Sequence, residues 1–149
     1  KTHFAITLFG VLFLIEHVQY KFAFVVVAFA ATLLPDIDSG FSTLGKYNVF
    51  RPIQIFTKHR GLIHSFSLCM ILTLLFALYL PIYALPFFLG YALHLFADSF
   101  TIDGIRPFWP LAKVSKGKIR VGGTLEGVVF MSFFIIDAVL LFYLVFLLF

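Results

Sequence analysis

Five histidines and seven acidic residues are the side chains of this 149-residue chain that could bind a metal ion or move a proton. Two of them, His94 and Asp98, are four residues apart, which places both on one face of a helix. Neutral imidazole and carboxylate are ligands for zinc, manganese and ferrous iron. The spacing therefore indicates a metal site, although a structural pair that joins two helices would show the same pattern.

Two further pairs extend this pattern. Asp36 and Asp38 follow a proline that ends a helix, so an extended backbone would point both carboxylates the same way. His59 and His64 are five residues apart and reach one centre only if His59 precedes the helix. A tight turn at Gly61 allows this, because glycine adopts conformations that other residues avoid.

The composition indicates which kind of protein carries these residues. The chain is 62% hydrophobic and 12% charged, with a mean hydropathy of +1.06, against roughly 45–50% and about 25% in soluble domains. A chain of this size has too little interior to hide so much apolar surface from water. We therefore exclude a soluble domain, a disordered chain and a fibrous chain, and expect an all-α integral membrane protein. The single cysteine, Cys69, excludes a disulfide framework and a Cys-rich zinc site, and we expect it to pack in the interior.

Five apolar stretches predict a bundle of about five transmembrane helices in a single domain over residues 1–149. They cover residues 4–15, 22–35, 61–80, 82–100 and 124–149. A span needs about 20 residues, so the last three qualify and the first two are short. The first two form a hairpin only if residues 16–21 lie at the far interface; one broken span or a re-entrant pair is the alternative. The first stretch also resembles a secretory signal peptide, but the polar residues at 16–21 interrupt it, so we expect it to be retained.

The basic residues predict the orientation. Nine of the eleven Lys and Arg lie in two loops, residues 36–60 and 101–123, and both loops should be cytoplasmic by the positive-inside rule. The N-terminus is then inside, the C-terminus outside, and the protein is a multi-pass protein of the cytoplasmic (inner) membrane. Eight of the twelve His, Asp and Glu residues gather at the cytoplasmic face. Seven of these are candidate metal ligands: His3, Asp36, Asp38, His59, His64, His94 and Asp98.

These seven candidate ligands are more than the four that a tetrahedral ion binds. Two divalent ions bridged by a carboxylate, about 3.5–4 Å apart, fit the number better, with zinc preferred and manganese or iron as alternatives. Three residues are candidates for catalysis: Arg60 would orient a phosphate, Glu126 would be a ligand or a general base, and His59 a further ligand or a proton carrier. Asp137 lies deeper in the last stretch and stays outside the site, as a buried structural partner or part of a proton path.

Several of these residues belong to motifs. After His3, the chain contains LPDID at 34–38, HRGLIHS at 59–65 and GYALH at 90–94, which runs on to Asp98, Thr101, Gly104, Trp109 and Pro110. With the Gly-Gly pair at 122–123 and Glu126, they resemble the bacterial and archaeal inner-membrane metal-dependent hydrolase family, which includes a LexA-regulated hydrolase. The resemblance spans most of the chain and implies a helical membrane protein with His and Asp ligands. One departure is Ile63, where the family usually has Thr. The arrangement is also distantly similar to zinc-dependent phospholipase C, which implies phosphate esters as substrates.

These observations leave three functions open. The first is a metal-dependent hydrolase that acts on a lipid or a lipid-linked phosphate ester at the cytoplasmic leaflet, with membrane lipids as partners. The second is a metal or proton transporter, which would need ionisable residues near the midplane, where only Asp137 lies. The third is a structural or accessory subunit of a membrane complex or oligomer, with a metal that ties its helices together. Nucleic-acid binding is not expected, because the basic loops lack a recognisable module and face an anionic leaflet.

Overall fold

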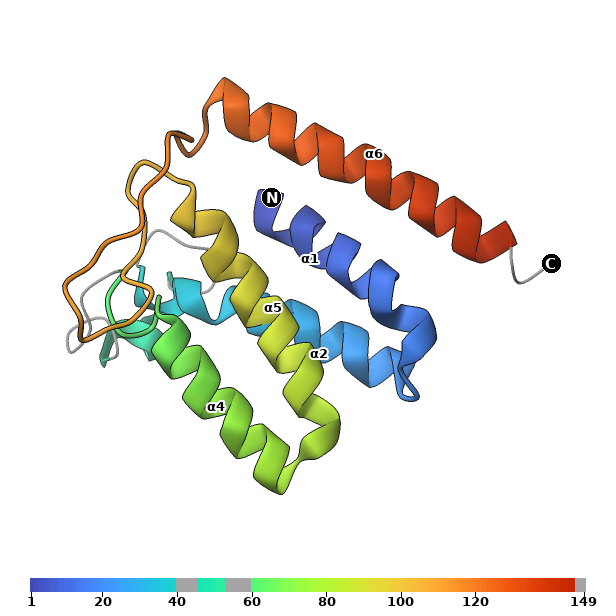
Figure 1. Cartoon of the computed structure of the whole chain (residues 1–149), viewed down its shortest axis with the longest axis horizontal. Coiled ribbons are helices and arrows are strands. Elements are labelled where there is room, and N and C mark those ends of the chain that lie inside the picture. The colour runs from blue at the N-terminus through green and yellow to red at the C-terminus, as the bar shows by residue number, and fades with distance from the viewer. Residues whose placement is uncertain (40–45, 53–59, 147–149) are drawn as a thin grey trace.

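Helices joined by turns and two long loops make up the fold (Figure 1). The computed structural model describes residues 1–39, 46–52 and 60–146, and over these residues it has five α-helices and no β-strand. The helices are α1 (Thr2–Leu14), α2 (Lys21–Leu33), α4 (Phe66–Tyr79), α5 (Pro81–Ser99) and α6 (Thr124–Phe146). Short 3-10 turns follow α1 (η1, Ile15–His17) and α2 (η2, Pro35–Asp38), and a third, η3 (Asn48–Phe50), lies in the first loop. The all-α prediction is therefore confirmed for the described residues.

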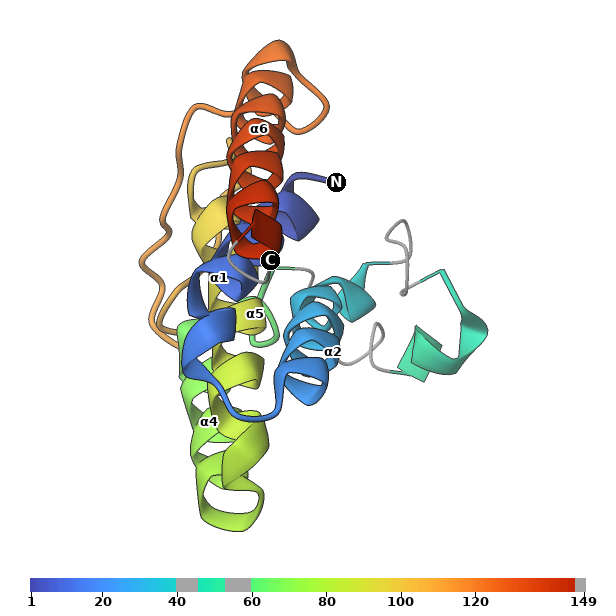
Figure 2. The ribbon, with the colours of Figure 1, turned by 90° about the vertical axis from the view of Figure 1, so that its right-hand side faces the viewer.

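The first two helices form a hairpin, an arrangement that both a pair of short spans and a re-entrant pair would show. The turn between α1 and α2 is closed by an exposed salt bridge of 2.7 Å between Lys21 and Glu16. Figure 2 shows α2 beside α1 and α5, with residues 46–52 beyond it. The hairpin matters for the site because it brings the start of α1 and the end of α2 to the same end of the molecule (Figure 1).

Helix length does not confirm a bundle of five membrane spans. Among the described residues, α6 is the one helix long and apolar enough to cross a membrane, with 23 residues. Helices α1 and α2 have 13 residues each, which is about 20 Å at 1.5 Å per residue, against about 30 Å of hydrocarbon. The structure thus supports one span by length and composition. The other four described helices are too short or not apolar enough to be identified as membrane spans in this way.

The start of α4 differs from the prediction. The apolar stretch at 61–80 predicts a helix over its whole length, but α4 begins at Phe66, and residues 60–65 form turns and bends. Ser65 is the N-cap residue, since its Oγ accepts a hydrogen bond from the N–H of Leu68 at 3.2 Å. His64 therefore lies in a turn before the helix, and the prediction that it lies inside a span is wrong.

Helix α5 forms the centre of the packing and contacts α1, α2 and α4. Its approach to α2 is close because residue 90 is glycine: a Cβ at Gly90 would lie 1.9 Å from the carbonyl oxygen of Ala28. Cys69 is fully buried in the core beside Tyr91 and Leu95, so the prediction that it packs in the interior is confirmed. Helix α6 packs along α1 and leaves most of its large apolar side chains exposed.

Candidate metal centre

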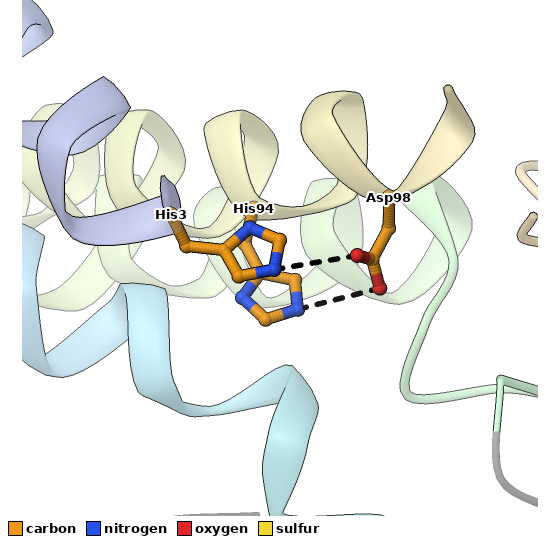
Figure 3. Close-up of side chains that lie close together, drawn as sticks. All are labelled: His3, His94 and Asp98. Carbon is orange, nitrogen blue, oxygen red and sulfur yellow. Dashed lines mark ion pairs between the residues drawn. The ribbon is translucent and has the colours of Figure 1, made fainter. Parts of the chain in front are cut away.

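Five helix ends that carry the candidate ligands lie at one end of the molecule (Figure 1). They are the start of α1, the end of α2, the start of α4, the end of α5 and the start of α6. His3 comes from α1, and His94 and Asp98 come from α5 (Figure 3). The rings of His3 and His94 are stacked, with centroids 4.1 Å apart and planes 11° apart. Residues from the N-terminus and from a helix about 90 positions later therefore share one centre.

His94 has a defined tautomer. Its Nδ1 lies 2.8 Å from the carbonyl oxygen of Thr32, and because a carbonyl only accepts, Nδ1 carries the proton and donates it. The other nitrogen, Nε2, therefore has a lone pair. It is buried and has no hydrogen-bond partner among the described residues. In metal sites, one nitrogen of a ligating histidine typically donates to a backbone carbonyl while the other binds the ion. Nδ1 of His94 donates in this way, and its Nε2 faces acidic side chains.

His64 is oriented in the same way by a carboxylate. Its Nδ1 lies 3.2 Å from Oδ2 of Asp38, and both side chains are buried. The opposite nitrogen, Nε2, faces Asp98, at 3.5 Å from its Oδ2. Asp38 thus lies behind the His64 ring, where a carboxylate fixes the ring and raises its basicity as a ligand.

Asp98 connects the histidines. Its Oδ1 is 3.3 Å from Nε2 of His3, while its Oδ2 faces Nε2 of both His64 (3.5 Å) and His94 (3.6 Å). The two carboxylate oxygens therefore point toward different histidines. This is the arrangement of a carboxylate that can bridge two cations.

Two sets of three residues could each hold a metal ion. One is His3, His94 and Asp98; the other is Asp36, His64 and His94, and within each set the candidate ligand atoms lie within 4.8 Å of one another. Asp36 reaches the centre with its Oδ1, which is 3.8 Å from Nε2 of His94. Since one imidazole lone pair binds one ion, His94 can serve only one of two ions at a time. The nitrogen and oxygen donors match zinc, manganese or ferrous iron.

Arg60 joins three of the helix ends. It has a left-handed backbone, with φ of 61°, and its N–H donates to Oδ2 of Asp38 at 3.3 Å. Its Nη1 donates to Oγ1 of Thr101 at 3.0 Å and to the carbonyl of Gly104 at 2.8 Å. Its Nη2 lies 3.7 Å from Oδ2 of Asp98. A non-glycine residue in this conformation is uncommon and is kept only where the surroundings determine it.

Glu126 lies at the edge of the centre. Its Oε1 accepts a hydrogen bond from Thr2 at 2.7 Å, and its Oε2 accepts one from the N–H of Gly122 at 2.5 Å. It lines a cavity of about 290 Å³ between α1, α5 and α6, together with His3 and Asp98. The rest of that cavity is largely apolar, with Phe96, Phe100, Ile119, Val121 and Phe133 among its lining residues.

His59 is outside the described residues. Three of the remaining acids and histidines lie away from the centre. Asp137 is buried on α6, and among the described residues neither of its carboxylate oxygens has a hydrogen-bond partner. Glu16 and His17 are in the far turn between α1 and α2. The structure thus brings together six of the seven proposed ligands, although Asp38 belongs to neither set of three.

Two residues that contact the site, Thr32 and Tyr91, are not among the predicted site residues. Thr32 contributes its carbonyl to His94, and Tyr91 donates its hydroxyl to the carbonyl of Ile63, next to His64, at 2.5 Å. A backbone carbonyl leaves no trace in residue type, so sequence patterns give no signal for Thr32. Tyr91 belongs to the GYALH motif, and a tyrosine in an apolar helix is itself a signal, because a buried hydroxyl needs a partner.

Comparison with known proteins gives one match. Residues 1–149 match the model of a protein family described as YdjM inner membrane protein. No curated protein matches the chain, and no solved structure does. The match covers the whole chain and supports the inner-membrane localisation that the sequence predicts.

Proposed function

The chain belongs to the YdjM inner membrane protein family, and from the geometry of its candidate metal centre we propose that it is a membrane-bound metal-dependent hydrolase. Its substrate would be a phosphate ester carried by a lipid or a lipid-linked group at the cytoplasmic leaflet. The observation that carries the proposal is the buried Nε2 of His94. Its tautomer is fixed by Thr32, and the nitrogen faces Asp98 and Asp36 at 3.6 and 3.8 Å.

The proposed cofactor is a pair of divalent ions, zinc first. The feature that supports two ions is the carboxylate of Asp98, whose oxygens face different histidines. The two sets of three residues share His94, so only one of them can be complete when two ions are bound. One ion would be held by His3 and Asp98, and the other by His64, His94, Asp36 and the second oxygen of Asp98. His59, outside the described residues, remains a proposed further ligand or proton carrier.

The proposed reaction is cleavage of a P–O ester bond by water. A bound divalent metal lowers the pKa of its water toward 7 and polarises the phosphoryl group. The water oxygen bonds to phosphorus, the ester oxygen leaves, and a proton passes to the leaving oxygen. Because His3 is assigned to an ion here, His59 is the candidate to carry that proton; the exposed fraction of the His3 side chain, 28%, leaves the first ion open to water and substrate. Arg60 would keep Asp98 in place and contribute positive charge toward the phosphate.

Two observations favour a substrate carried by a lipid. The cavity that His3 and Asp98 share with Glu126 is otherwise mainly apolar, so it suits an alkyl chain next to a polar group. Helices α4 and α6 leave many large apolar side chains exposed, which suits contact with lipid. We propose that all five helices lie in the membrane, with the metal centre, the N-terminus and both basic loops at the cytoplasmic side.

The test combines metal content with turnover. The purified protein should contain about two zinc ions per chain and hydrolyse one of three classes offered to it: phospholipids, lipid-linked phosphates or water-soluble phosphoesters. Asp98→Ala should lose both metal and turnover, and a chelator should abolish turnover. Glu16→Ala is the matched control, because it removes an acid at the far turn and should change neither. Tightly bound metal with all coordination positions filled by protein, and no turnover, would instead favour a structural subunit.

A further inference from the structure

A second cavity, of about 280 Å³, lies next to the metal centre. Three cationic side chains line it, those of Arg60, Arg106 and Lys116, and Asp103 is the one acid among its lining residues. Arg60 belongs to both places, since its Nη2 is 3.7 Å from Asp98 while its guanidinium also borders this cavity. The first cavity, which Asp98 lines, is largely apolar, whereas this second one is lined about equally by polar and apolar atoms and carries more cations than acids.

The backbone of the second loop builds this cavity. Ile105 and Ser115 form an antiparallel bridge, with both N–H···O distances at 2.9 Å. Ile105 is buried, whereas Arg106 and Lys116, which flank the bridge, are exposed, and all three line the cavity. The two cations are thus held on paired backbone and not on a free loop.

Gly104 leaves room for these cations. Its φ is +67°, and a Cβ there would lie 2.1 Å from the carbonyl oxygen of Ser115 and 2.7 Å from Cγ of Lys116. Because Gly104 has no side chain, Lys116 can lie close to the backbone at this point. The carbonyl of the same glycine accepts the hydrogen bond from Arg60 that holds the guanidinium at the cavity wall.

The charges in this cavity are not balanced. Asp103 lies 3.8 Å from Nη2 of Arg60. Among the described residues no acid forms a salt bridge with Arg106 or Lys116. Guanidinium and ammonium groups that converge without acidic partners form a binding site for a phosphate-type anion.

We propose that this cavity binds a phosphate-type anion, namely a second anionic group of the substrate. This inference rests on the proposed function, which places the group to be hydrolysed at Asp98. Arg60 lies between Asp98 and the cavity, so an anion held by Arg106 and Lys116 is beside the metal ligands and not on them. The substrate class is therefore a lipid with two neighbouring anionic groups, such as a lipid diphosphate.

The test measures binding without turnover. The zinc-treated protein is placed in phosphatidylcholine nanodiscs and titrated with dodecane-1,1-diphosphonate, dodecane-1-phosphonate and inorganic phosphate. The alkyl chains are joined to phosphorus by P–C bonds, so none of the three contains an ester bond to cleave. The diphosphonate should bind about tenfold more tightly than the monophosphonate, since hydrogen bonds to charged groups are strong. Lys116→Ala and Arg106→Ala should each remove most of this preference, and Lys116→Arg should restore it.

Lys113→Ala is the matched control, because it removes a cation from the same loop that does not line the cavity. Equal losses in Lys113→Ala and Lys116→Ala would overturn the proposal and indicate general surface charge. Equal affinity for the two phosphonates, with Lys116 needed only for inorganic phosphate, would also overturn it and indicate a site for free phosphate. Absence of turnover with every ester would contradict the proposed function but would leave this binding result intact.

Discussion

A single added methyl group at Gly90 should test how the fold positions the metal centre. In Gly90→Ala the new Cβ would lie 1.9 Å from the carbonyl oxygen of Ala28, where ordinary contact begins at 3.4 Å. The Ala28 oxygen is a backbone atom and a Cβ is fixed rigidly to its own backbone, so α2 and α5 must separate by about 1.5 Å to reach normal contact. The same two helices carry the hydrogen bond from His94 to the carbonyl of Thr32, which is 2.8 Å long. Separation by that amount takes the pair to about 4 Å, beyond hydrogen-bond range.

Two measurable losses follow from this displacement. Overpacking of a close contact should lower the free energy of unfolding by about 1–3 kcal/mol. Loss of the hydrogen bond that fixes the His94 ring should weaken metal binding by about 10- to 100-fold. Thermal unfolding of the metal-free protein in detergent measures the first effect. Competition with a zinc chelator of known affinity measures the second effect.

Two other glycines provide matched controls for this experiment. Gly127→Ala adds the same methyl group to α6 where no atom lies within 4 Å, so it should leave metal affinity unchanged. Gly10→Ala meets the tip of the Leu93 side chain at 2.8 Å, which can move, and should cost less than Gly90→Ala. If Gly90→Ala unfolds and binds zinc as the unmodified protein does, the close approach of α2 and α5 does not hold His94, and the reasoning is refuted.

Three further substitutions separate the roles of the acids. Asp38→Asn keeps the shape of the side chain but removes the charge behind His64, and should weaken zinc binding by about 10- to 100-fold in the chelator assay; unchanged affinity would mean that Asp38 does not orient the ring. Glu126→Gln weakens the hydrogen bonds to Thr2 and to the turn before α6, and should lower the free energy of unfolding by about 1 kcal/mol without loss of metal; loss of metal would identify Glu126 as a ligand. Glu16→Ala breaks an exposed salt bridge and should cost less than about 1 kcal/mol in thermal unfolding, so a larger cost would show that the far turn stabilises the fold.

Sequence patterns predicted the helices better than their ends. Apolar stretches identified all five described helices, because a run of apolar residues is visible in any single sequence. The start of α4 was misjudged because Gly61 and Leu62 continue the apolar pattern, while the capping hydrogen bond of Ser65 and the left-handed backbone of Arg60 decide where the helix begins. Capping depends on a local conformation that hydropathy does not report.

The types of residue at the site were predictable, but the partner that each side chain contacts was not. Spacing placed His94 and Asp98 on one helix face, and the structure brings them to 3.6 Å. The prediction that an extended backbone points Asp36 and Asp38 the same way is wrong, because Pro35–Asp38 is a 3-10 turn. The Asp36 oxygen points toward His94, and Asp38 lies behind the His64 ring. Two residues in the short turn after α2 have different partners because each meets a different helix, and only the packing of those helices decides which.

The contacts of Arg60 explain how separate helix ends become one centre. Its backbone N–H binds Asp38, which follows α2, and its guanidinium binds Thr101, which follows α5. Thr101 in turn donates its hydroxyl to the carbonyl of Asp98 at 2.7 Å, so one arginine fixes both the side chain and the main chain at the end of α5. The donor atoms come together only when these helices are packed, and the unfolded chain offers no comparable site. A divalent ion that binds there must therefore stabilise the folded protein, by a free energy that grows with the logarithm of the ratio of the ion concentration to the dissociation constant.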